Sequence, residues 1–243
     1  MRFRTVGRVA ALFRYPVKSM AAEPLSDVEI GWHGFVGDRR WGFIRPGMEE
    51  SGFPWLTIRE HPGMWQYQPS FVEPGRPDSS PTRVRTPSGE DRDVVDPVLA
   101  AELGEGVRPI RQKRGVFDTA PLSLLTTRAV ANIAAEVGSP LDIQRFRPNL
   151  VVEVYDDIPD RFPEDGWIGT VVRVGDAVVR VDQRDRRCVM VNVDPTTTGI
   201  DGTVLRTIAH EREGYLGVYG NVVTPGRVAV GDPVELEIAP AIG

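Results

Sequence analysis

The sequence predicts a mostly β protein (α+β) with a few short helices, built from two packed β-barrel-like halves. Its 25 glycines and 21 prolines are spread along all 243 residues, with many short valine-rich runs between them. This spacing of glycine and proline favours short strands joined by turns, which is the pattern of β-barrels and β-sandwiches. The length allows one large β domain or two small ones, and 41% hydrophobic and 26% charged residues are typical of a globular chain.

Charge and cysteine content narrow the functional classes. With 29 basic and 34 acidic residues the net charge is −5, so the composition gives no support to nucleic-acid binding. The single cysteine cannot form an internal disulfide. The apolar run at residues 9–13 is too short for a membrane span, and no cleavable signal pattern follows it. We therefore expect a cytoplasmic protein without nucleic-acid or membrane partners.

The first half is predicted to be rich in strands. Alternating apolar residues predict a strand at residues 6–15, and Pro16 ends it because proline lacks the amide hydrogen that a ladder needs. A helix is expected at Pro97–Leu103, with Asp96 as N-cap and Gly104 as its stop. Further strands are expected at residues 28–32, 41–45, 53–59, 64–71, 82–86, 91–95 and 107–111.

The second half follows residues 112–115, the best candidate boundary, which gives domains at 1–112 and 113–243. Apolar residues at i, i+3, i+4 and i+7 predict a helix that Thr126 or Thr127 caps and Gly138 ends. Gly175 and Asp176 predict a two-residue hairpin turn. A short helix is expected at residues 204–210, and strands are expected at residues 150–154, 170–174, 177–181, 189–193, 215–223 and 228–238.

The stretch 181–195 holds the only cysteine, Cys188, directly after Arg184, Asp185, Arg186 and Arg187. Neighbouring arginines favour the thiolate, which is both the nucleophilic and the metal-binding form of cysteine. A small buried residue that happens to be cysteine is the competing interpretation. Because the apolar residues 189–193 are expected to form a buried strand, we expect the thiol to lie where a cationic loop enters a sheet.

Basic or small polar residues recur at the ends of predicted strands. Such a set can surround a phosphorylated, oxygen-rich anion, and a thiolate among them adds a ligand for a soft metal. Because Arg147 precedes Pro148, we expect an extended backbone that holds its guanidinium in a defined direction. The residues concerned are Lys18, Ser19, Arg39, Thr119, Arg147, Asn149, Arg186 and Arg187.

Other chemistries have less support in the residue pattern. The sequence contains no phosphate-binding P-loop, dinucleotide-binding glycine motif or serine-hydrolase elbow. His33, His61 and His210 lack zinc-type spacing, so we expect no histidine metal site. A dyad of Cys188 with His210 stays open as an alternative. Tyr219 lies between Gly217 and Gly220, which predicts close approach of either a ligand or a neighbouring backbone.

The motifs occur in an order that resembles the MOSC family with its N-terminal β-barrel domain. Within that family the chain resembles the mitochondrial amidoxime-reducing component and the bacterial YcbX-like proteins. The resemblance runs from about residue 6 to about residue 236. It is carried by YPVKS, GDRRW, DTAP, FRPN, RRC, VDP and GRVAVGDPVEL, in that order.

The resemblance implies a molybdenum cofactor, that is, a pterin dithiolene with a phosphate tail and an oxo-molybdenum centre. Pyridoxal phosphate is not expected. Cys188 matches the cysteine that ligates molybdenum and is the implied catalytic residue. Lys18 and Ser19 match contacts to the phosphate end. Further implied cofactor contacts are Arg39, Thr119, Ala120, Arg147, Asn149, Arg186, Arg187 and Tyr219.

The chain also departs from the family pattern. Ala120 stands where relatives often carry serine, and Arg186 stands where a small polar residue is common. YcbX-like relatives carry a C-terminal ferredoxin domain, but this sequence has no further cysteine that could hold an iron–sulfur cluster. We therefore expect electrons to come from a separate donor protein of ferredoxin or flavoprotein type.

The function that the resemblance implies is reduction of N-hydroxylated or N-oxide-type small molecules, with the cofactor supplying the difficult chemistry. Two alternatives come from other classes. A carrier would bind the cofactor without turnover and hand it to another enzyme. A sulfur carrier would hold a labile persulfide on Cys188 instead of a metal.

Overall fold

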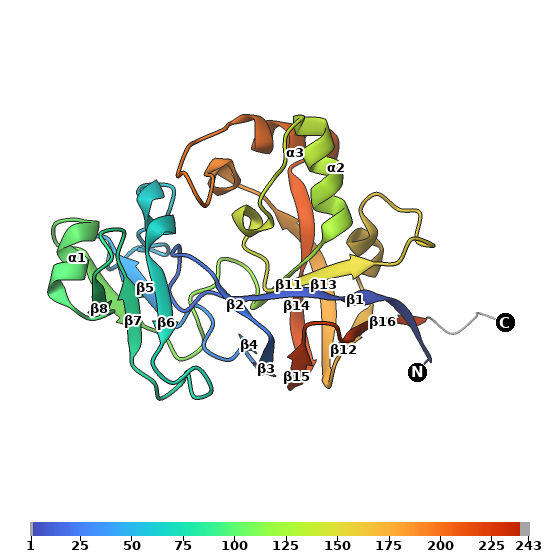
Figure 1. The fold of residues 1–243 in the computed structure, drawn as a ribbon, viewed down its shortest axis with the longest axis horizontal. Coiled ribbons are helices and arrows are strands. Elements are labelled where there is room, and N and C mark those ends of the chain that lie inside the picture. Colours follow the sequence, from blue (N-terminus) through green and yellow to red (C-terminus); the bar gives the residue numbers. More distant parts are fainter. Residues whose placement is uncertain (1, 239–243) are drawn as a thin grey trace.

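The computed structural model describes residues 2–238, and it confirms the mostly β fold (Figure 1). Seven strands form a closed barrel, because β11 pairs with β1 and thereby closes the ring. The pairing of β10 with β11 is parallel. In their order around the ring the strands are β11 (Leu150–Val154), β10 (Leu122–Thr126), β14 (Tyr215–Thr224), β13 (Ala177–Arg186), β12 (Val171–Val174), β16 (Pro233–Ile238) and β1 (Arg2–Arg14).

Smaller sheets lie beside the barrel. The short strand β2 (Glu23–Leu25) extends the barrel sheet along β1. The other sheets are β15 (Gly226–Ala229) with β3 (Asp27–Gly31) and β4 (Gly34–Phe35), then β5 (Trp41–Ile44) with β9 (Arg108–Arg111), and finally β6 (Gln68–Phe71) with β7 (Thr82–Arg85) and β8 (Asp91–Asp93). The sheets with β5 to β8 are on the left in Figure 1, and the sheet of β15, β3 and β4 is at the bottom, near the middle.

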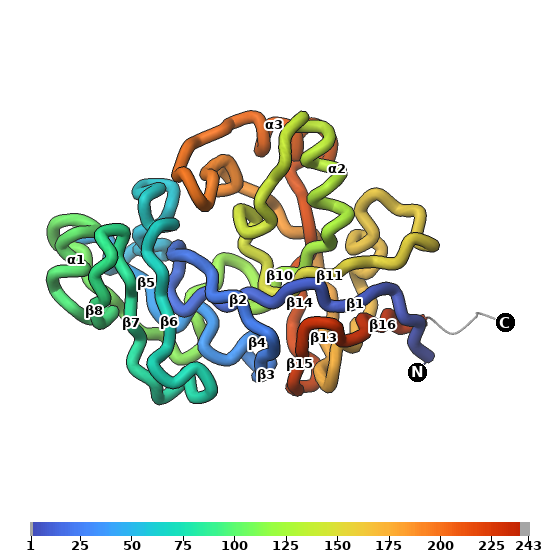
Figure 2. Tube along the Cα trace, in the orientation of Figure 1, coloured from blue at the N-terminus to red at the C-terminus, as the bar shows by residue number. Residues whose placement is uncertain are grey.

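The two predicted halves share strands. The N-terminal strand β1 belongs to the barrel, where it pairs with the C-terminal strand β16, so the blue and red ends of the chain run side by side in Figure 2. In the other direction, β15 from the second half pairs with β3 from the first. The proposed boundary at residue 112 stays a prediction, but neither half completes its sheets without the other.

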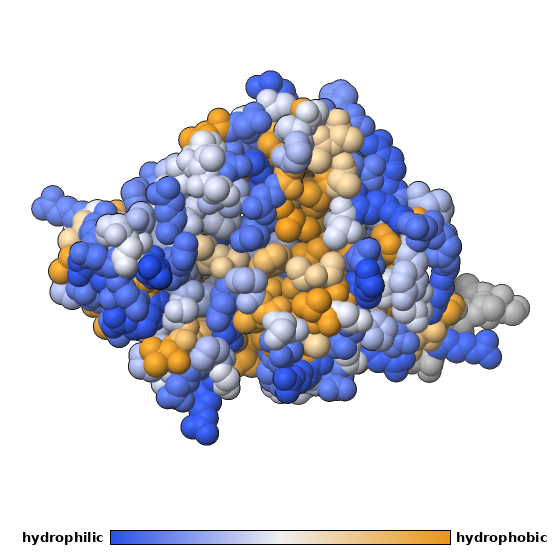
Figure 3. Space-filling view, viewed as in Figure 1, coloured by the Kyte–Doolittle hydropathy of each residue, from blue (hydrophilic) through white to orange (hydrophobic). Residues whose placement is uncertain are grey.

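Alternation of apolar and polar residues explains the barrel strands. In β13 the side chains of Ala177, Val179 and Val181 are buried, and Val178 and Arg180 between them are more exposed. Burying each valine contributes about 1.5–3 kcal/mol. On the face in Figure 3 the apolar residues gather near the middle, over the barrel, and polar residues cover the margins.

Two helices begin and end where the sequence predicts, and the third is longer than the predicted 204–210 at both ends. In α1 (Pro97–Leu103) the Asp96 carboxylate accepts a hydrogen bond from the amide of Val98. In α2 (Thr127–Val137) the Thr126 hydroxyl accepts from the amide of Ala129, and Gly138 ends the helix in the left-handed conformation. The third helix, α3 (Thr203–Arg212), packs against α2. Within the described residues, no helix has the length and apolar character to cross a membrane.

Two predicted strands contain 3-10 turns. Residues 189–193 are not a strand; they contain the 3-10 helix η4 (Val189–Asn192), in which Val191 packs against α3 and Val189 is exposed. Residues 64–71 divide into the 3-10 helix η1 (Pro62–Gln66) and the strand β6. Both runs contain buried apolar residues, such as Trp65 and Val191, and burial alone does not distinguish a strand from a turn. The remaining 3-10 helices are η2 (Ile143–Phe146) and η3 (Pro163–Trp167).

Two further strand predictions are corrected. Residues 53–59 are not a strand, because only Trp55 forms an isolated bridge and Thr57–Glu60 closes as a turn. Ile58 in that segment is fully buried, and it packs with Trp65 and Val193 where the two halves meet. Residues 228–238 form parts of two strands, because a turn around Gly231 sends β15 and β16 into different sheets.

Candidate functional site

A cavity of about 380 Å³ opens between the barrel and the smaller sheets. Its lining comes from loops that leave or enter strands of both halves, including the loop after β1 and the end of β13. This volume is in the range of small-molecule sites. All the site residues predicted from the sequence line it: Lys18, Ser19, Arg39, Thr119, Ala120, Arg147, Asn149, Arg186, Arg187, Cys188 and Tyr219.

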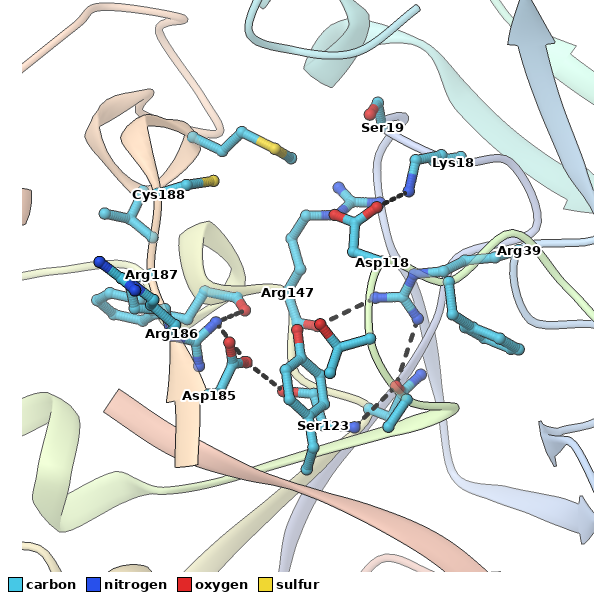
Figure 4. A pocket seen from close by; sticks show the side chains of 18 of the residues that line it. Lys18, Ser19, Arg39, Asp118, Ser123, Arg147, Asp185, Arg186, Arg187 and Cys188 are labelled. Atoms are coloured by element: carbon cyan, nitrogen blue, oxygen red, sulfur yellow. Dashed lines mark hydrogen bonds and ion pairs between the residues drawn. The ribbon is translucent and has the colours of Figure 1, made fainter. Parts of the chain in front are cut away.

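One side of the pocket is built around the buried Lys18 (Figure 4). Its ammonium pairs with the Asp118 carboxylate and donates to the carbonyl oxygen of Val116 at 3.3 Å. Burial lowers the pKa of Lys18, and attraction to Asp118 offsets this only in part. Burial also works against ionisation of Asp118, but the charge and hydrogen bond of Lys18, together with the charges of Arg39 and Arg59, outweigh it and keep the pKa of Asp118 below its usual value.

Three pocket residues have left-handed backbones although they are not glycines. Their φ angles are 67° for Ser19, 48° for Arg39 and 52° for Arg147, and only Thr198 and Glu213 share this feature elsewhere in residues 2–238. The prediction of an extended backbone at Arg147 is therefore wrong, because it is the C-cap of η2, where its amide donates to the carbonyl of Gln144 at 2.8 Å. Such strain gathers at binding sites, where the surrounding structure holds it.

The Arg147 guanidinium is enclosed by aromatic rings and fixed by backbone. It lies 4.1 Å from the ring centre of Tyr15 and 4.8 Å from that of Trp65, and its Nη1 donates to the carbonyl of Met20 at 2.8 Å. Burial lowers the pKa of Arg147 to about 10, so the group stays charged at neutral pH. The Arg39 guanidinium donates to the carbonyl of Arg147 at 3.3 Å.

Cys188 lies two residues after β13, at the N-cap of η4. Arg184 and Arg186 are on the strand and Arg187 directly follows it, so the thiol comes after a strand and not on a loop that enters a sheet. The Arg59 guanidinium donates a hydrogen bond from Nη2 to the Cys188 sulfur at 3.3 Å. Arg59 comes from the first half, so both halves meet at the thiol (Figure 4 shows the thiol side).

A buried acidic group supports the floor of the pocket below Cys188. Asp185 accepts from the Ser123 hydroxyl at 3.2 Å and pairs with Arg187 at 2.9 Å. Burial raises the pKa of Asp185 to about 6, although Arg187 opposes the shift. Burial and Asp185 also raise the pKa of Tyr219.

Gly220, beside Tyr219, shows whether a ligand or a neighbouring backbone approaches closely at this position. A Cβ at Gly220 would lie 2.8 Å from the carbonyl oxygen of Arg180 and 2.7 Å from a methyl of Val179, so β13 itself approaches this position. Neighbouring backbone, rather than a ligand, therefore explains the glycine. His210, the candidate dyad partner of Cys188, does not line the cavity and contacts Glu211 instead.

The pocket is strongly cationic although the whole chain is acidic. Seven arginine and lysine residues and two aspartates line it, which leaves a formal charge of +5, against −5 for the whole chain. Buried donors also remain free, since the Ser19 Oγ and the Nη2 atoms of Arg147 and Arg187 have no hydrogen-bond partner within residues 2–238. These features suit a ligand with several anionic oxygens.

A metal ion in this pocket would need ligands beyond the protein. Within residues 2–238 there is no group of three or more histidine, cysteine, aspartate or glutamate side chains that could hold a metal ion. Cys188 alone supplies one soft ligand, so the remaining ligands would have to arrive with a cofactor. A pterin dithiolene with a phosphate tail fits this donor set, because sulfur suits soft metals and the cations suit phosphate.

Several lining residues were missed from the sequence. Asp118 and Ser123 lie within or just after the DTAP motif, so their position beside Thr119 was the available signal. Arg59 and Phe53 lay inside the segment predicted as a strand, and nothing in their local sequence pointed to Cys188, 129 residues away. Asp185, Arg145, Phe146, Phe117, Met190 and Val191 complete the set of missed lining residues.

These features define a mostly β ligand-binding protein whose cationic pocket carries a single thiol. Comparison with known families agrees. The model of the MOSC domain matches residues 111–235, and that of the MOSC N-terminal beta barrel domain matches residues 6–96. The chain therefore belongs to the MOSC family.

Individual relatives are distant. Over 130 residues the chain is 31% identical to mitochondrial amidoxime reducing component 2 of Homo sapiens, a match that covers 48% of this chain and 37% of that protein. It thus matches little more than a third of that relative's length. Mitochondrial amidoxime-reducing component 1 of Xenopus laevis is 23% identical over 291 residues, covering 94% of this chain and 82% of that protein.

A solved structure supports the fold. The YUAD protein from Bacillus subtilis superposes with a TM-score of 0.54 at 13% sequence identity, covering 98% of this chain and 99% of that one. At this identity the likeness concerns the fold alone.

Proposed function

We propose that this chain is a molybdenum-cofactor-dependent oxidoreductase that reduces N-hydroxylated or N-oxide-type small molecules. The observation that carries the proposal is the pocket itself, where seven cationic side chains and unpaired buried donors surround one side-chain thiol. Distant relatives named as amidoxime-reducing components support the reaction class.

The residues divide into two roles. Lys18, Ser19 and Arg147 offer an ammonium, an unpaired hydroxyl and an unpaired guanidinium nitrogen, which suit a phosphate group. Cys188 would hold the metal. Asp185 fixes Arg187, which also donates to the backbone carbonyls of Leu216 and Phe146, both at 2.7 Å. The binding groups are thus held in place before any ligand arrives, which limits the ordering cost of binding.

The chemistry requires a redox centre and an electron source. When bound, the molybdenum cofactor supplies the two-electron chemistry that breaks an N–O bond. For an N-hydroxylated substrate, two electrons and two protons convert the N–OH group to N–H and release one water. The protein's own part is to bind, orient and shield the reacting groups. We propose that the electrons come from a separate ferredoxin or flavoprotein.

Reduction of an amidoxime tests the proposal. Protein from a host with a confirmed cofactor supply is mixed with benzamidoxime and chemically reduced methyl viologen, and benzamidine is quantified. We expect turnover that Cys188→Ala abolishes. Bound molybdenum without turnover of any N-oxygenated compound would contradict the enzyme and indicate a carrier. A labile sulfur on Cys188 in metal-free protein, again without turnover, would indicate a sulfur carrier.

A further inference from the structure

Arg59 differs from four other cations of the pocket, each of which is paired with a carboxylate. Lys18 pairs with Asp118, Arg39 with Asp38, Arg145 with Asp194 and Arg187 with Asp185. Arg59 is exposed, and it forms no ion pair within the described residues. The paired cations hold the pocket together, whereas the charge of Arg59 is not neutralised by the protein.

The position of Arg59 is nevertheless fixed by its neighbours in sequence. Glu60 accepts hydrogen bonds from the amide of Thr57 at 3.0 Å and from its hydroxyl at 2.7 Å, which closes the turn. Ile58 is fully buried and packs against Trp65 and Val193, the latter five residues after Cys188. The turn is thereby anchored to the segment that carries the thiol.

Most N–H donors of the Arg59 guanidinium have no acceptor within the described residues. Nη2 contacts the Cys188 sulfur at 3.3 Å, and the group lies 5.6 Å from the ring centre of Phe53. An arginine has five N–H donors in a planar fork, and the described chain provides a hydrogen-bond acceptor only through Cys188. The remaining donors match the two oxygens of a carboxylate, which arginine binds through paired hydrogen bonds.

We propose that Arg59 determines substrate specificity by binding a carboxylate on the substrate, beside Cys188. The substrate class is then small N-oxygenated compounds that carry an anionic group, in preference to neutral or cationic ones. Arg186 adds to this preference, because it also lines the pocket, is exposed and has no ion pair within the described residues. The identity of the reacting N–O group rests on the proposed function, whereas recognition of the anion rests on the position of Arg59 and can be tested without that function.

Alkylation of Cys188 tests anion recognition without any cofactor. In full-length protein prepared without cofactor, the thiolate displaces iodide from either iodoacetate, which is anionic, or iodoacetamide, which is neutral. Cys188 is the only cysteine, so mass spectrometry reports one site. The ratio of the two rates cancels the fraction of thiolate, because both reagents react with the same form.

We expect Arg59→Gln to lower the iodoacetate-to-iodoacetamide rate ratio by about tenfold, the size of a charge-assisted hydrogen bond. Arg59→Lys keeps the charge and is expected to retain most of the ratio. Arg76→Gln removes an exposed charge outside the pocket lining and is the matched control. An unchanged ratio in Arg59→Gln, with the melting temperature of wild type, would overturn the proposal.

A second experiment separates this proposal from the proposed function. With loaded enzyme, KM is compared for benzamidoxime and for its para-carboxylate. We expect Arg59→Gln to raise the ratio of KM for the carboxylate to KM for the neutral compound about tenfold. A lowered alkylation ratio without reduction of either compound would support anion recognition and contradict the reductase. Reduction of both with equal KM in wild type and Arg59→Gln would contradict anion recognition alone.

Discussion

The barrel wall and the pocket lining use the same chain in opposite ways. In the wall, the strands are extended and their inward side chains are apolar, as with Val179 and Val181. In the pocket lining, Ser19, Arg39 and Arg147 take left-handed backbones, and charged groups are buried. A left-handed residue that is not glycine costs about 1–2 kcal/mol. The wall therefore stabilises the fold, and the lining uses part of that stability to order a binding site.

This contrast makes separate predictions for the two regions. Substitutions in the wall should change stability and leave the ligand content of the folded protein alone. Substitutions in the lining should change ligand content, and some of them should make the protein more stable.

The largest loss of stability is expected for Gly7→Ala in the wall. A Cβ at Gly7 would lie 2.2 Å from the carbonyl oxygen of Glu153 and 2.9 Å from the Cα of Val154, so β1 and β11 would have to separate. We expect destabilisation of about 3 kcal/mol in a denaturant titration. Gly52→Ala, where a Cβ meets nothing within 4 Å, is the control. If Gly7→Ala unfolded with the same free energy as the wild type, the close contact between β1 and β11 would not limit the size of this residue.

Glu164 lies in η3, against the end of the barrel strand β10, and should make stability depend on pH. It is fully buried; Oε2 accepts from the Thr126 hydroxyl at 2.7 Å, and Oε1 has no partner in residues 2–238. Burial raises the pKa of Glu164 from 4.5 to about 7. The folded state thus holds the proton more tightly than the unfolded state. Stability should therefore fall as pH rises from about 4.5 to about 7, by up to about 3 kcal/mol.

Glu164→Gln should remove this part of the pH dependence, measured by chemical denaturation between pH 4.5 and pH 8. Glu105→Gln, at an exposed position, should leave the slope as it is in the wild type. The cofactor content of Glu164→Gln should not change, because Glu164 lies outside the pocket lining. A slope equal to that of wild type would show that Glu164 does not titrate in this range.

The smallest effect on stability, with the opposite sign, is expected for Ser19→Gly in the lining. Glycine relieves the left-handed strain and removes an unpaired buried hydroxyl, and its greater freedom when unfolded offsets part of the gain. We expect a gain of about 1 kcal/mol together with reduced cofactor content. Thr198→Gly has the same backbone conformation outside the pocket lining and should gain stability without losing cofactor. If Ser19→Gly kept the full cofactor content, that result would contradict a role of Ser19 in binding the cofactor.

The same contrast explains what the sequence could predict. The wall strands and the helices follow from local periodicity and caps, as at Thr126 and Asp96, because each element buries a regular face. The residues 53–59 and 189–193 were wrongly predicted as strands. Ile58 and Val193 are buried against each other where the halves meet, and periodicity carries no signal of such contacts.

The site was predictable only where chemistry and family pattern coincide. The motif residues, Cys188 among them, meet in one pocket, and their roles toward a cofactor stay predictions. Arg59 could not be found, because its contact with Cys188 spans 129 residues. The left-handed backbone of Arg147 was also missed, because the general preference before proline yields here to the C-cap of η2.

The central claim is that the pocket binds a molybdenum cofactor through Cys188. The most direct measurement is the molybdenum content of protein from a host with a confirmed cofactor supply, compared with Cys188→Ala from the same host. We predict close to one molybdenum per chain in the wild type and a decrease of about tenfold or more in the variant, since loss of a ligand should cost at least as much as loss of its supporting contacts. Wild-type protein without molybdenum, or a variant with as much metal as the wild type, would contradict the account.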